Sequence, residues 1–480
     1  MALSLEQEDV ITSIASGDSL FLTGPGGTGK SHLIHSLRAK FPTKNIAITA
    51  MTGCAALLIG DGAKTLHSWA GIGLGKGTVE ATVTTIKKVS PLSKRWRQTD
   101  ILVIDEVSML TPELLELLNE IAKRLRKSER PMGGMQVVLV GDFLQLPPVA
   151  KGSVIRFAFE SPAWPQIIKK TFHLKRIFRQ QDSSFQKILD EARMGDLSSE
   201  SLITLKARLN LSYEHELIQP TMLFTRKMDV DQINKAHLDA LEGTAYSFSV
   251  RTPPVLGHPA VEIQRTVEKM DKDANYVTEL ILKVGAQVML LKNIDQEKGL
   301  VNGSRGVVTG FKDDPLHYPI VLFKNQEQRV ISPELWGSDH EPPIHREQIP
   351  LRLAYALTIH KAQGATLDCA VIDIGPSTFE YGQAYVALSR VKSLDCLYIH
   401  DVAPSAFRAH PTVKKFYNGS YTMPVAPAVP VAPVAPIPVA PLSVPKEKKK
   451  KGITAKSGYS FADDIEVPVQ VQKTLTGWLS

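Results

Sequence analysis

The sequence GPGGTGKS at residues 24–31 fits the phosphate-binding pattern G-x-x-x-x-G-K-[ST]. A short apolar run at residues 20–22 precedes it and an amphipathic segment at residues 32–37 follows it, which is the strand-then-helix context that this pattern requires. Glycines let the backbone aim its N–H groups at phosphates, and the helix N-terminus adds positive potential. We therefore expect a nucleoside triphosphate to be bound by Gly24, Pro25, Gly26, Gly27, Thr28, Gly29, Lys30 and Ser31.

Two residues of this loop have the chemistry for more specific roles. Lys30 is expected to reach the β- and γ-phosphates, and Ser31 is expected to bind Mg²⁺. A Gly-rich turn with a purely structural role is the alternative. The loop alone does not indicate what process the triphosphate would drive.

Two further apolar runs end in residues suited to hydrolysis. Residues 101–104 lead into Asp105, which is expected to hold Mg²⁺ through its water shell, and Glu106, a general base for attack of water on the γ-phosphate. Residues 137–140 lead into GDFLQLPPV, which brings Asp142 and Gln145 to the same sheet edge. Gln145 is expected to sense the γ-phosphate. The alternatives are an acidic pair that only ends a strand and an ordinary turn.

The composition is that of a large globular chain. Its 480 residues, 43% of them hydrophobic, predict about three domains. The net charge of +7 is compatible with a polyanionic partner but does not require one. Three cysteines without C-x-x-C spacing support neither a disulfide framework nor a zinc site. We found no membrane-spanning run and no signal peptide, so we expect an intracellular protein of the nucleus or a host cytoplasm.

The order of apolar runs predicts an α/β fold with parallel sheets to about residue 405. Residues 285–345 interrupt it with short strand-like runs and turns, which predicts a small inserted β-barrel. Beyond residue 420 the chain becomes a Pro, Ala and Val tract at 424–445, followed by the basic run KEKKKK at 446–451. This composition predicts a disordered tail, and the basic run is compatible with a nuclear address, a DNA tether or solubility.

The ordered motifs resemble those of superfamily-one DNA helicases of the 5′-to-3′ branch, close to the Pif1 family and its phage Dda-like relatives. The matching stretches, across residues 3–402, are LEQEDVI, GPGGTGKS, TAMTGCAALLIG with TLHSWAGIGLG, VIDEVSM, GDFLQLPPV, FRQQDSSFQKIL, LTIHKAQGATLD and YVALSRVKSLDCLYI. The resemblance implies two RecA-like lobes, at 1–180 and at 181–284 with 346–405. It also implies a wedge insertion at 72–98, an SH3-like domain at 285–345 and a tail at 406–480.

The resemblance also assigns roles in the use of ATP. Gln7 corresponds to a glutamine that reads adenine, although a solvated helix-surface residue is the alternative. Arg179 and Arg390 correspond to two arginines that neutralise the γ-phosphate, the alternative being surface ion pairs. Gly364, beside Gln363, is expected to link the nucleotide to nucleic acid between the lobes.

Single-stranded DNA is expected to cross both lobes through phosphate contacts rather than base edges. The implied contacts are Thr52, Gly53, His67, Ser68, Thr358, His360 and Lys361, with weaker candidates at Lys292, Asn293, Asn302 and Arg305. For His67 a structural role is the alternative, and Trp69 fits either a core position or a stacking platform. The wedge residue stays open, since Trp96 is the first aromatic of the 72–98 insertion.

The last residues suggest a partner. Gln472, Leu475, Trp478 and Leu479 resemble the short peptide that binds sliding clamps, although Leu479 replaces the usual second aromatic. An incidental amphipathic terminus is the alternative.

Taken together, the resemblance and the motifs predict an ATP-dependent 5′-to-3′ DNA helicase of replication, repair or recombination. It would act as a monomer, away from membranes, on single-stranded and on forked or tailed duplex DNA. A nucleotide-gated remodelling ATPase that does not unwind and an RNA helicase are the alternatives.

Overall fold

A computed structural model describes residues 3–422 except 61, 74, 76, 150–153, 210, 214–217, 256, 273, 275, 296 and 338–343. The Pro-rich tract, the basic run and the candidate clamp peptide at 472–479 therefore lie outside the described residues. Within the described part, no helix combines the length and apolar character needed to cross a membrane. The residues up to Pro424 form one compact unit.

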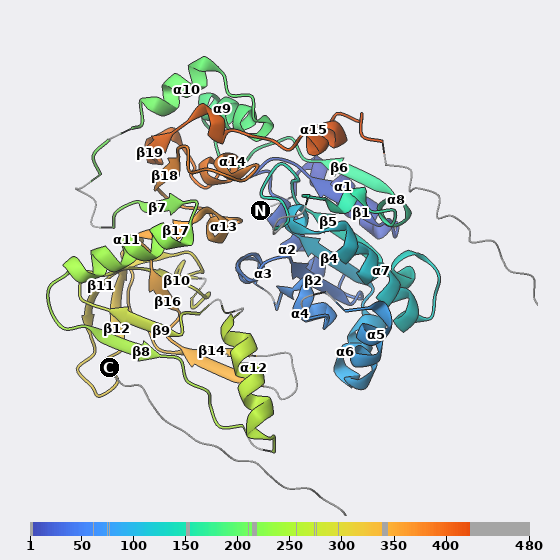
Figure 1. Ribbon diagram of the computed structural model, residues 1–480, viewed down its shortest axis with the longest axis horizontal. Helices are drawn as coiled ribbons and strands as arrows, with labels where there is room; N and C mark the ends of the chain where they lie inside the picture. The colour runs from blue at the N-terminus through green and yellow to red at the C-terminus, as the bar shows by residue number, and fades with distance from the viewer. Residues whose placement is uncertain are drawn as a thin grey trace, which may run out of the picture. The chain divides into compact units, whose positions relative to one another are not determined.

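The first lobe is built on a six-stranded parallel sheet with the strand order β3-β2-β4-β5-β1-β6 (Figure 1). Parallel strands covered on both faces read as continuous apolar runs, and all five residues of β4 are buried. The strands are β1 (Leu20–Thr23), β2 (Ile46–Ala50), β3 (Lys64–Thr65), β4 (Ile101–Asp105), β5 (Gln136–Val140) and β6 (Lys170–His173).

Helices cover this sheet through two separate apolar cores. The α-helices are α1 (Leu5–Ala15), α2 (Lys30–Lys40), α3 (Gly53–Ile59), α4 (Leu66–Ala70), α5 (Val79–Lys88), α6 (Ser90–Gln98), α7 (Pro112–Arg126) and α8 (Trp164–Ile167). The short 3₁₀ helices are η1 (Val107–Met109), η2 (Pro131–Gly134) and η3 (Ala158–Glu160). Helix α2 follows β1 directly, as the phosphate-loop pattern predicts.

The predicted wedge region contains α5 and α6, but its tryptophan is not a wedge. Trp96 is 0% exposed, and its indole N–H donates to the Ala70 carbonyl at 3.0 Å. Its ring centroid lies 4.7 Å from that of Trp69, which is also buried. Both side chains fill the core between the insertion and the lobe, so neither can stack on DNA, because neither is accessible.

The second lobe holds a four-stranded parallel sheet with the order β17-β7-β18-β19. Its strands are β7 (Thr221–Phe224), β17 (Ala356–Thr358), β18 (Ala370–Ile374) and β19 (Leu397–Val402). Its helices are α9 (Ser183–Met194), α10 (Ser199–Lys206), α11 (Lys227–Ala240), α13 (Ile359–Ala362), α14 (Gln383–Leu388) and the 3₁₀ helix η4 (Leu394–Cys396). The predicted α/β class with two parallel-sheet lobes is confirmed.

An antiparallel β-domain separates α11 from β17. Its five-stranded sheet has the order β13-β12-β11-β10-β16, and two strand pairs, β8-β9 and β14-β15, accompany it. The elements are β8 (Tyr246–Ser249), α12 (Ala260–Lys272), β9 (Glu279–Leu282), β10 (Gln287–Leu290), β11 (Arg305–Phe311), β12 (Pro319–Phe323), β13 (Gln328–Val330), β14 (Glu334–Gly337), β15 (His345–Gln348) and β16 (Leu351–Leu353).

This β-domain is larger than the predicted 285–345. Strand β16 pairs with β10, and Leu280 and Leu282 share one apolar core with Val288. The sequence limits were too narrow because the added strands are short and lie next to turns that resemble domain boundaries. An SH3-like barrel within this domain stays a prediction.

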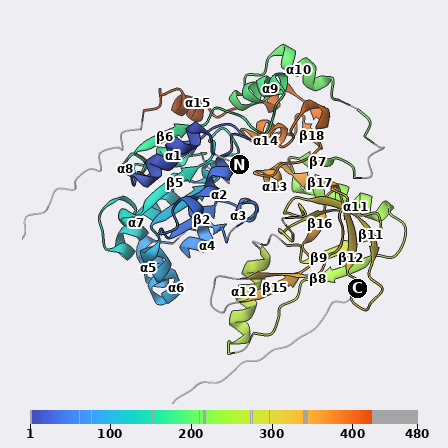
Figure 2. The same ribbon diagram turned by 180° about the vertical axis from the view of Figure 1, so that it is seen from behind.

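The prediction that the tail starts at residue 406 is wrong. The chain continues through η5 (Pro404–Ala406) into α15 (Pro411–Tyr417). Val413 is buried in the core of the first lobe, and the Phe416 ring stacks on Phe159 with centroids 4.1 Å apart. Figures 1 and 2 both show α15 beside the β6 region. The apolar residues Val413, Phe416 and Tyr417 are spaced so that they lie on one face of a helix, and this face packs on the first lobe. The prediction missed this helix because it lies just before the change in composition near residue 420.

Candidate functional site

The phosphate loop lies between β1 and α2 with the backbone that glycine allows. Gly27 and Gly29 have φ values of 85° and 84°, in the left-handed region. A Cβ at Gly27 would also lie 2.7 Å from the Cβ of Arg179, so only glycine lets these segments approach. Lys30 opens α2, and its ammonium donates to the Gly24 and Pro25 carbonyls at 2.7 and 2.9 Å. Burial lowers the pKa of Lys30, and nearby carboxylates oppose this.

The acidic pair lies at the end of β4, beside this loop. Both Asp105 and Glu106 are buried, and the Glu106 N–H donates to Asp105 Oδ1 at 2.9 Å. Burial, then the charge of Glu106, raises the pKa of Asp105 to about 7. Glu106 has a φ of 56°, uncommon for a residue with a side chain. Backbone strain of this kind is found at functional sites, where the surrounding structure maintains it.

A cleft of about 490 Å³ joins these groups to the second lobe. From the first lobe it is lined by Gly26, Gly27, Gly29, Lys30, Ser31, His32, Asp105, Glu106 and Gln145, and from the interlobe segment and second lobe by Phe178, Arg179, Gly364, Thr366 and Arg390. Gln363 donates to Glu106 Oε2 at 2.9 Å, which connects the two lobes directly. The structure thus brings all six predicted catalytic residues to one cavity. Their individual roles stay predictions.

Two arginines, Arg179 and Arg390, enter this cleft. Arg390 is 2% exposed, and its guanidinium donates to Val386 O at 2.7 Å, Ala365 O at 3.1 Å and Ser389 Oγ at 2.6 Å. Arg179 donates to Ser389 O at 2.9 Å. Burial, then Arg179, lowers the pKa of Arg390 to about 9. No carboxylate among the described residues forms an ion pair with either guanidinium, although the charge of Glu106 acts on both, so an anion in the cleft would give them a direct partner.

The comparisons with known proteins agree with this geometry. A family model described as PIF1-like helicase matches residues 2–201, and one described as DNA helicase Pif1, 2B domain matches residues 274–311. The crystal structure of Pif1 helicase from Candida albicans is 40% identical with a TM-score of 0.76, covering 87% of this chain and 99% of that one. The chain belongs to the PIF1-like helicase family. The resemblance predicted from the motifs is confirmed.

Two further relatives of this PIF1-like chain show how its length compares and which ligand a related protein binds. The ATP-dependent DNA helicase PIF1 of Xenopus laevis is 38% identical over 420 residues, covering 87% of this chain and 64% of that protein. The chain thus spans less than two thirds of the length of that curated relative. A crystal structure of Bacteroides Pif1 in complex with ADP-AlF4 is 27% identical with a TM-score of 0.68, covering 87% of this chain and 97% of that one.

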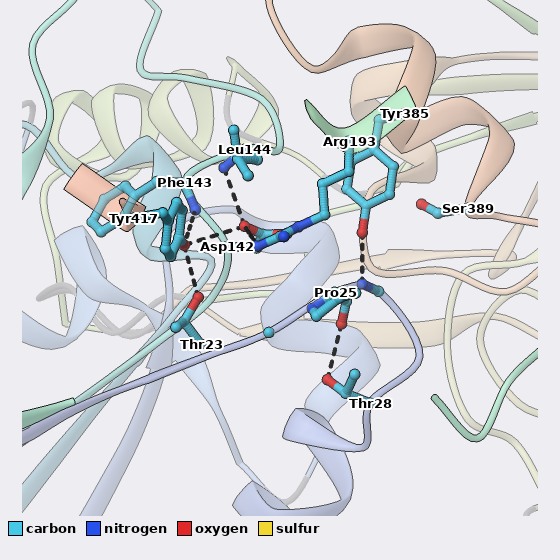
Figure 3. A network of polar contacts seen from close by, with 12 residues as sticks. Thr23, Pro25, Thr28, Asp142, Phe143, Leu144, Arg193, Tyr385, Ser389 and Tyr417 are labelled. Atoms are coloured by element: carbon cyan, nitrogen blue, oxygen red, sulfur yellow. Dashed lines mark hydrogen bonds and ion pairs between the residues drawn. The ribbon is translucent and has the colours of Figure 1, made fainter. Parts of the chain in front are cut away.

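A buried network that sequence reasoning missed supports the cleft of this PIF1-like chain (Figure 3). Asp142, predicted at the nucleotide edge, does not line the cleft. It is 0% exposed and is held by Arg193 of α9, with Nε–Oδ2 at 2.8 Å and Nη2–Oδ1 at 2.9 Å. The Tyr417 hydroxyl donates to Asp142 Oδ1 at 3.2 Å and lies 2.7 Å from Thr23 Oγ1. Burial disfavours the Asp142 charge, but Arg193, Lys30 and the Leu144 N–H together outweigh burial and lower the pKa of Asp142.

A second missed residue contacts the phosphate loop itself. The Gly26 N–H donates to the Tyr385 hydroxyl of α14 at 2.7 Å, across the lobes. Tyr385 lies in the same stretch as Arg390, YVALSR, so the sequence could have predicted that Tyr385 lies near the nucleotide site. Arg193 has no such signal, and Tyr417 fell in the segment predicted to be tail. Contacts between distant segments are not visible in local patterns.

The remaining predicted nucleotide residues shape the loop rather than line the cleft. Gln7 donates from Nε2 to Gly29 O at 3.1 Å and accepts from the Ser4 N–H at 2.9 Å in a capping box. Its amide touches the loop, and its role toward adenine stays a prediction. Thr28 donates to Pro25 O at 2.9 Å, which tightens the turn.

The two lobes present matching threonines at strand ends. Thr52 caps α3 after β2 by accepting from the Ala55 N–H at 3.2 Å, and Thr358 caps α13 after β17 by accepting from the Lys361 N–H at 3.3 Å. Burial lowers the pKa of Lys361, with Arg352 adding to the effect. Lys361 lines a small cavity of about 40 Å³ together with Cys54 of α3. Gly53 is the first residue of α3, and His67 and Ser68 lie in α4.

Three of the weaker DNA candidates form hydrogen bonds within the protein, and of these only Arg305 is buried, since Lys292 is half-buried and Asn293 is exposed. Arg305 is 4% exposed and donates to Gln219 O at 2.9 Å, so it cannot contact a strand. Lys292 donates to Leu335 O at 2.7 Å, and Asn293 Oδ1 accepts from the Asn302 N–H at 2.8 Å. These side chains build the β-domain.

Proposed function

We propose that this chain is an ATP-dependent DNA helicase that moves 5′ to 3′ on single-stranded DNA. The observation that carries the proposal is the cleft in which Lys30 and Glu106 of one lobe meet Arg390 of the other. Nucleotide binding between two lobes can change how they sit on a strand, whereas a site within one lobe cannot. Membership of the PIF1-like family supports the helicase class, and the direction rests on that membership alone.

The cleft suits a nucleoside triphosphate with Mg²⁺. Ser31 offers a hydroxyl and Asp105 a carboxylate in the same cavity, and Mg²⁺ in such sites uses one or two protein ligands beside phosphates and water. The residues therefore fit the ion, which when bound would neutralise phosphate charge. The loop N–H groups and Lys30 would hold the phosphates. The crystal structure of Bacteroides Pif1 in complex with ADP-AlF4 supports nucleotide binding by this chain.

We assign the hydrolytic step to residues at the cleft. Glu106, held by Gln363, would accept a proton from the attacking water. Arg179 and Arg390 would stabilise charge on the γ-phosphate. Gln145 would contact the γ-phosphate and lose that contact when the phosphate leaves. Because Gln363 and Arg390 belong to the second lobe and face the nucleotide side of the first, loss of the γ-phosphate would weaken closure of the lobes.

Single-stranded DNA is the proposed track. Thr52 in the first lobe and Thr358 in the second, each at a helix N-terminus, would donate hydrogen bonds from their hydroxyls to phosphates of the strand. A structure of Bacteroides Pif1 bound to single-stranded DNA, 28% identical, supports this partner, and forked or tailed duplex is the proposed substrate. Lys361 and His360 would assist at the second lobe, and we propose that one copy suffices.

A strand-displacement assay tests the activity. With 5′-tailed and 3′-tailed duplexes, we expect ATP-dependent unwinding from the 5′ tail only. ATP hydrolysis without unwinding would favour a remodelling ATPase, and stronger stimulation by RNA than by DNA would favour an RNA helicase. Lys30→Ala serves as the control that removes nucleotide use, and Lys187→Ala, an exposed change on α9, as the control that preserves it.

We also propose that residues 472–479 bind a sliding clamp, which would place the helicase at a replication or repair site in the nucleus or a host cytoplasm. The residues Gln472, Leu475, Trp478 and Leu479 support it by their spacing. In a pull-down with clamp protein, Leu475→Ala with Trp478→Ala should abolish capture, while Thr474→Ala should not. Capture by the double variant would refute the assignment.

A further inference from the structure

Two of the three cysteines lie side by side in the second lobe. Cys369 directly precedes β18 and Cys396 directly precedes β19, and these strands are parallel neighbours whose register begins with Ala370 opposite Leu397. The cysteines therefore occupy corresponding positions, one residue before that pair. Neighbouring strands lie about 4.8 Å apart, and the Cα atoms of a disulfide lie about 4.4–6.8 Å apart. The strand pairing thus brings the two residues into the range that a disulfide requires.

The side chains of the two cysteines also meet. Ala370 and Leu397 are both buried in the apolar core of the second lobe. Because successive side chains of a strand point to opposite faces, the residues just before them are expected together on the other face. A hydrogen bond between the Cys369 and Cys396 thiols agrees with this placement. Both residues carry thiols in the structure, so they form a dithiol rather than a disulfide.

The backbone on each side of this dithiol is held in place. The Arg208 guanidinium donates to Leu397 O at 2.9 Å and to Asp395 O at 3.2 Å, the carbonyls that flank Cys396. Cys369 leads into β18, which pairs with β7 on one side and with β19 on the other. A bond between the sulfurs would therefore form between groups that are already positioned, at little cost in entropy.

Exposure and charge decide how the two thiols can react. Both cysteines are half-buried, so a molecule as small as hydrogen peroxide can reach them. Burial, then the hydrogen bond with Cys396, raises the pKa of Cys369 to about 11, and Lys324 and Arg305 oppose this rise. Cys369 therefore keeps its proton near neutral pH and reacts slowly with an oxidant. We assign the first oxidation to Cys396.

The oxidation balances in two steps with a peroxide as the oxidant. The Cys396 thiolate attacks one oxygen of hydrogen peroxide, the O–O bond breaks, and a sulfenic acid and one water form once the thiol proton is included. The Cys369 thiolate then attacks the sulfenic sulfur, the S–O bond breaks, the S–S bond forms and a second water leaves. The two sulfurs together lose two electrons, which the peroxide gains. Because the second step is intramolecular, the adjacency of the thiols offsets the small thiolate fraction of Cys369.

The new bond would close a loop that carries a residue of the nucleotide cleft. The segment from Cys369 to Cys396 contains β18, α14 and Arg390. The Leu367 N–H donates to the Arg390 carbonyl at 2.9 Å, and the Arg390 guanidinium donates to Ala365 O at 3.1 Å. The segment that leads to Cys369 thus already contacts Arg390. A disulfide at the ends of this loop would restrict it further, above all in the unfolded chain.

We propose that Cys369 and Cys396 form a reversible disulfide when a peroxide oxidises this chain. The pair is a redox-sensitive cross-link of the second lobe, and a thiol reductant would restore the dithiol. This inference does not rest on the proposed helicase activity, so the strand-displacement assay and the experiments below can fail independently of each other.

Peptide mapping of the full chain tests the bond. After treatment with hydrogen peroxide at pH 8 and alkylation of the remaining thiols, we expect a linked pair of peptides that contain Cys369 and Cys396. Their joint mass should be lower by two hydrogen atoms, and dithiothreitol should separate them. Cys54 of the first lobe is also half-buried and is the internal control, because it should still be alkylated. Cys54→Ser should keep the linked peptides, and Cys396→Ser should abolish them.

Urea unfolding separates the bond from general oxidative damage. The urea midpoint of the wild type should rise after peroxide treatment, because the disulfide restricts the unfolded chain, and should return after reduction. The midpoint of Cys396→Ser should not rise. Absence of the linked peptides, a link to Cys54, a link whose yield grows with protein concentration, equal oxidation of all three cysteines, or the same rise in Cys396→Ser would overturn the proposal.

Discussion

The ion pair between Asp142 and Arg193 provides the sharpest test of how the lobes are held together. Arg193→Met keeps an apolar stem but removes the guanidinium that neutralises a carboxylate with 0% side-chain exposure. Removing one partner of a buried pair costs about 3–5 kcal/mol. The Tyr417 hydroxyl and the Leu144 N–H still donate to Asp142, so we expect the free energy of unfolding to fall by about 3 kcal/mol, at the lower end of this range.

The loss should depend on pH in a predictable direction. In the wild type, Arg193 holds the pKa of Asp142 below its usual range, so the pair stabilises the fold above that range and loses effect as pH falls. Without Arg193, burial should raise the pKa of Asp142. The variant can then protonate the carboxylate at low pH, so its deficit should be smaller near pH 5 than near pH 8.

Urea midpoints of the full chain at equal m-value measure these effects. Asp142→Asn with Arg193→Met should be more stable than Arg193→Met alone, because no buried charge remains. Lys187→Met on the same helix breaks an exposed pair with Glu200 and should cost about 0–1 kcal/mol. Asp142→Asn alone completes the cycle. If the loss of stability in the double variant equalled the sum of the losses in Asp142→Asn and Arg193→Met within about 0.5 kcal/mol, the two residues would not be coupled and the reasoning would fail.

Other predictions address the cleft and the core. Glu106→Gln should retain nucleotide binding while ATP turnover falls about 10²–10⁴-fold, and turnover at wild-type rate would exclude Glu106 as the base. Arg179→Lys should lower kcat more than it raises KM for ATP, because a planar donor is lost; an effect on KM alone would contradict this. Tyr417→Phe should cost about 1–3 kcal/mol in urea unfolding, since buried partners of its hydroxyl lose a hydrogen bond, and a neutral change would show that the network is dispensable. Trp96→Ala should lower stability by about 3–5 kcal/mol, while unwinding per folded molecule stays constant; a selective loss of unwinding would contradict a purely structural role for Trp96.

Much of the fold could be predicted because the relevant signals are local. Strand β4 is one apolar run ending in two carboxylates, and Gly27 and Gly29 mark a loop that only glycine can form. Motif order then predicted which residues share the cleft. The extent of the β-domain was less predictable, since β16 is short and its pairing with β10 is a contact between distant segments.

The sequence by itself determined the chemistry of each lobe: Lys30, Asp105 and Glu106 at strand ends on one side, and Arg390 on the other. Only the tertiary structure decided that Trp96 is core, that α15 folds onto the first lobe, and that Asp142 belongs to Arg193 and Tyr417 rather than to the nucleotide. The physical reason is that a residue's type fixes what it can bind, whereas burial and pairing depend on segments that local periodicity cannot bring together.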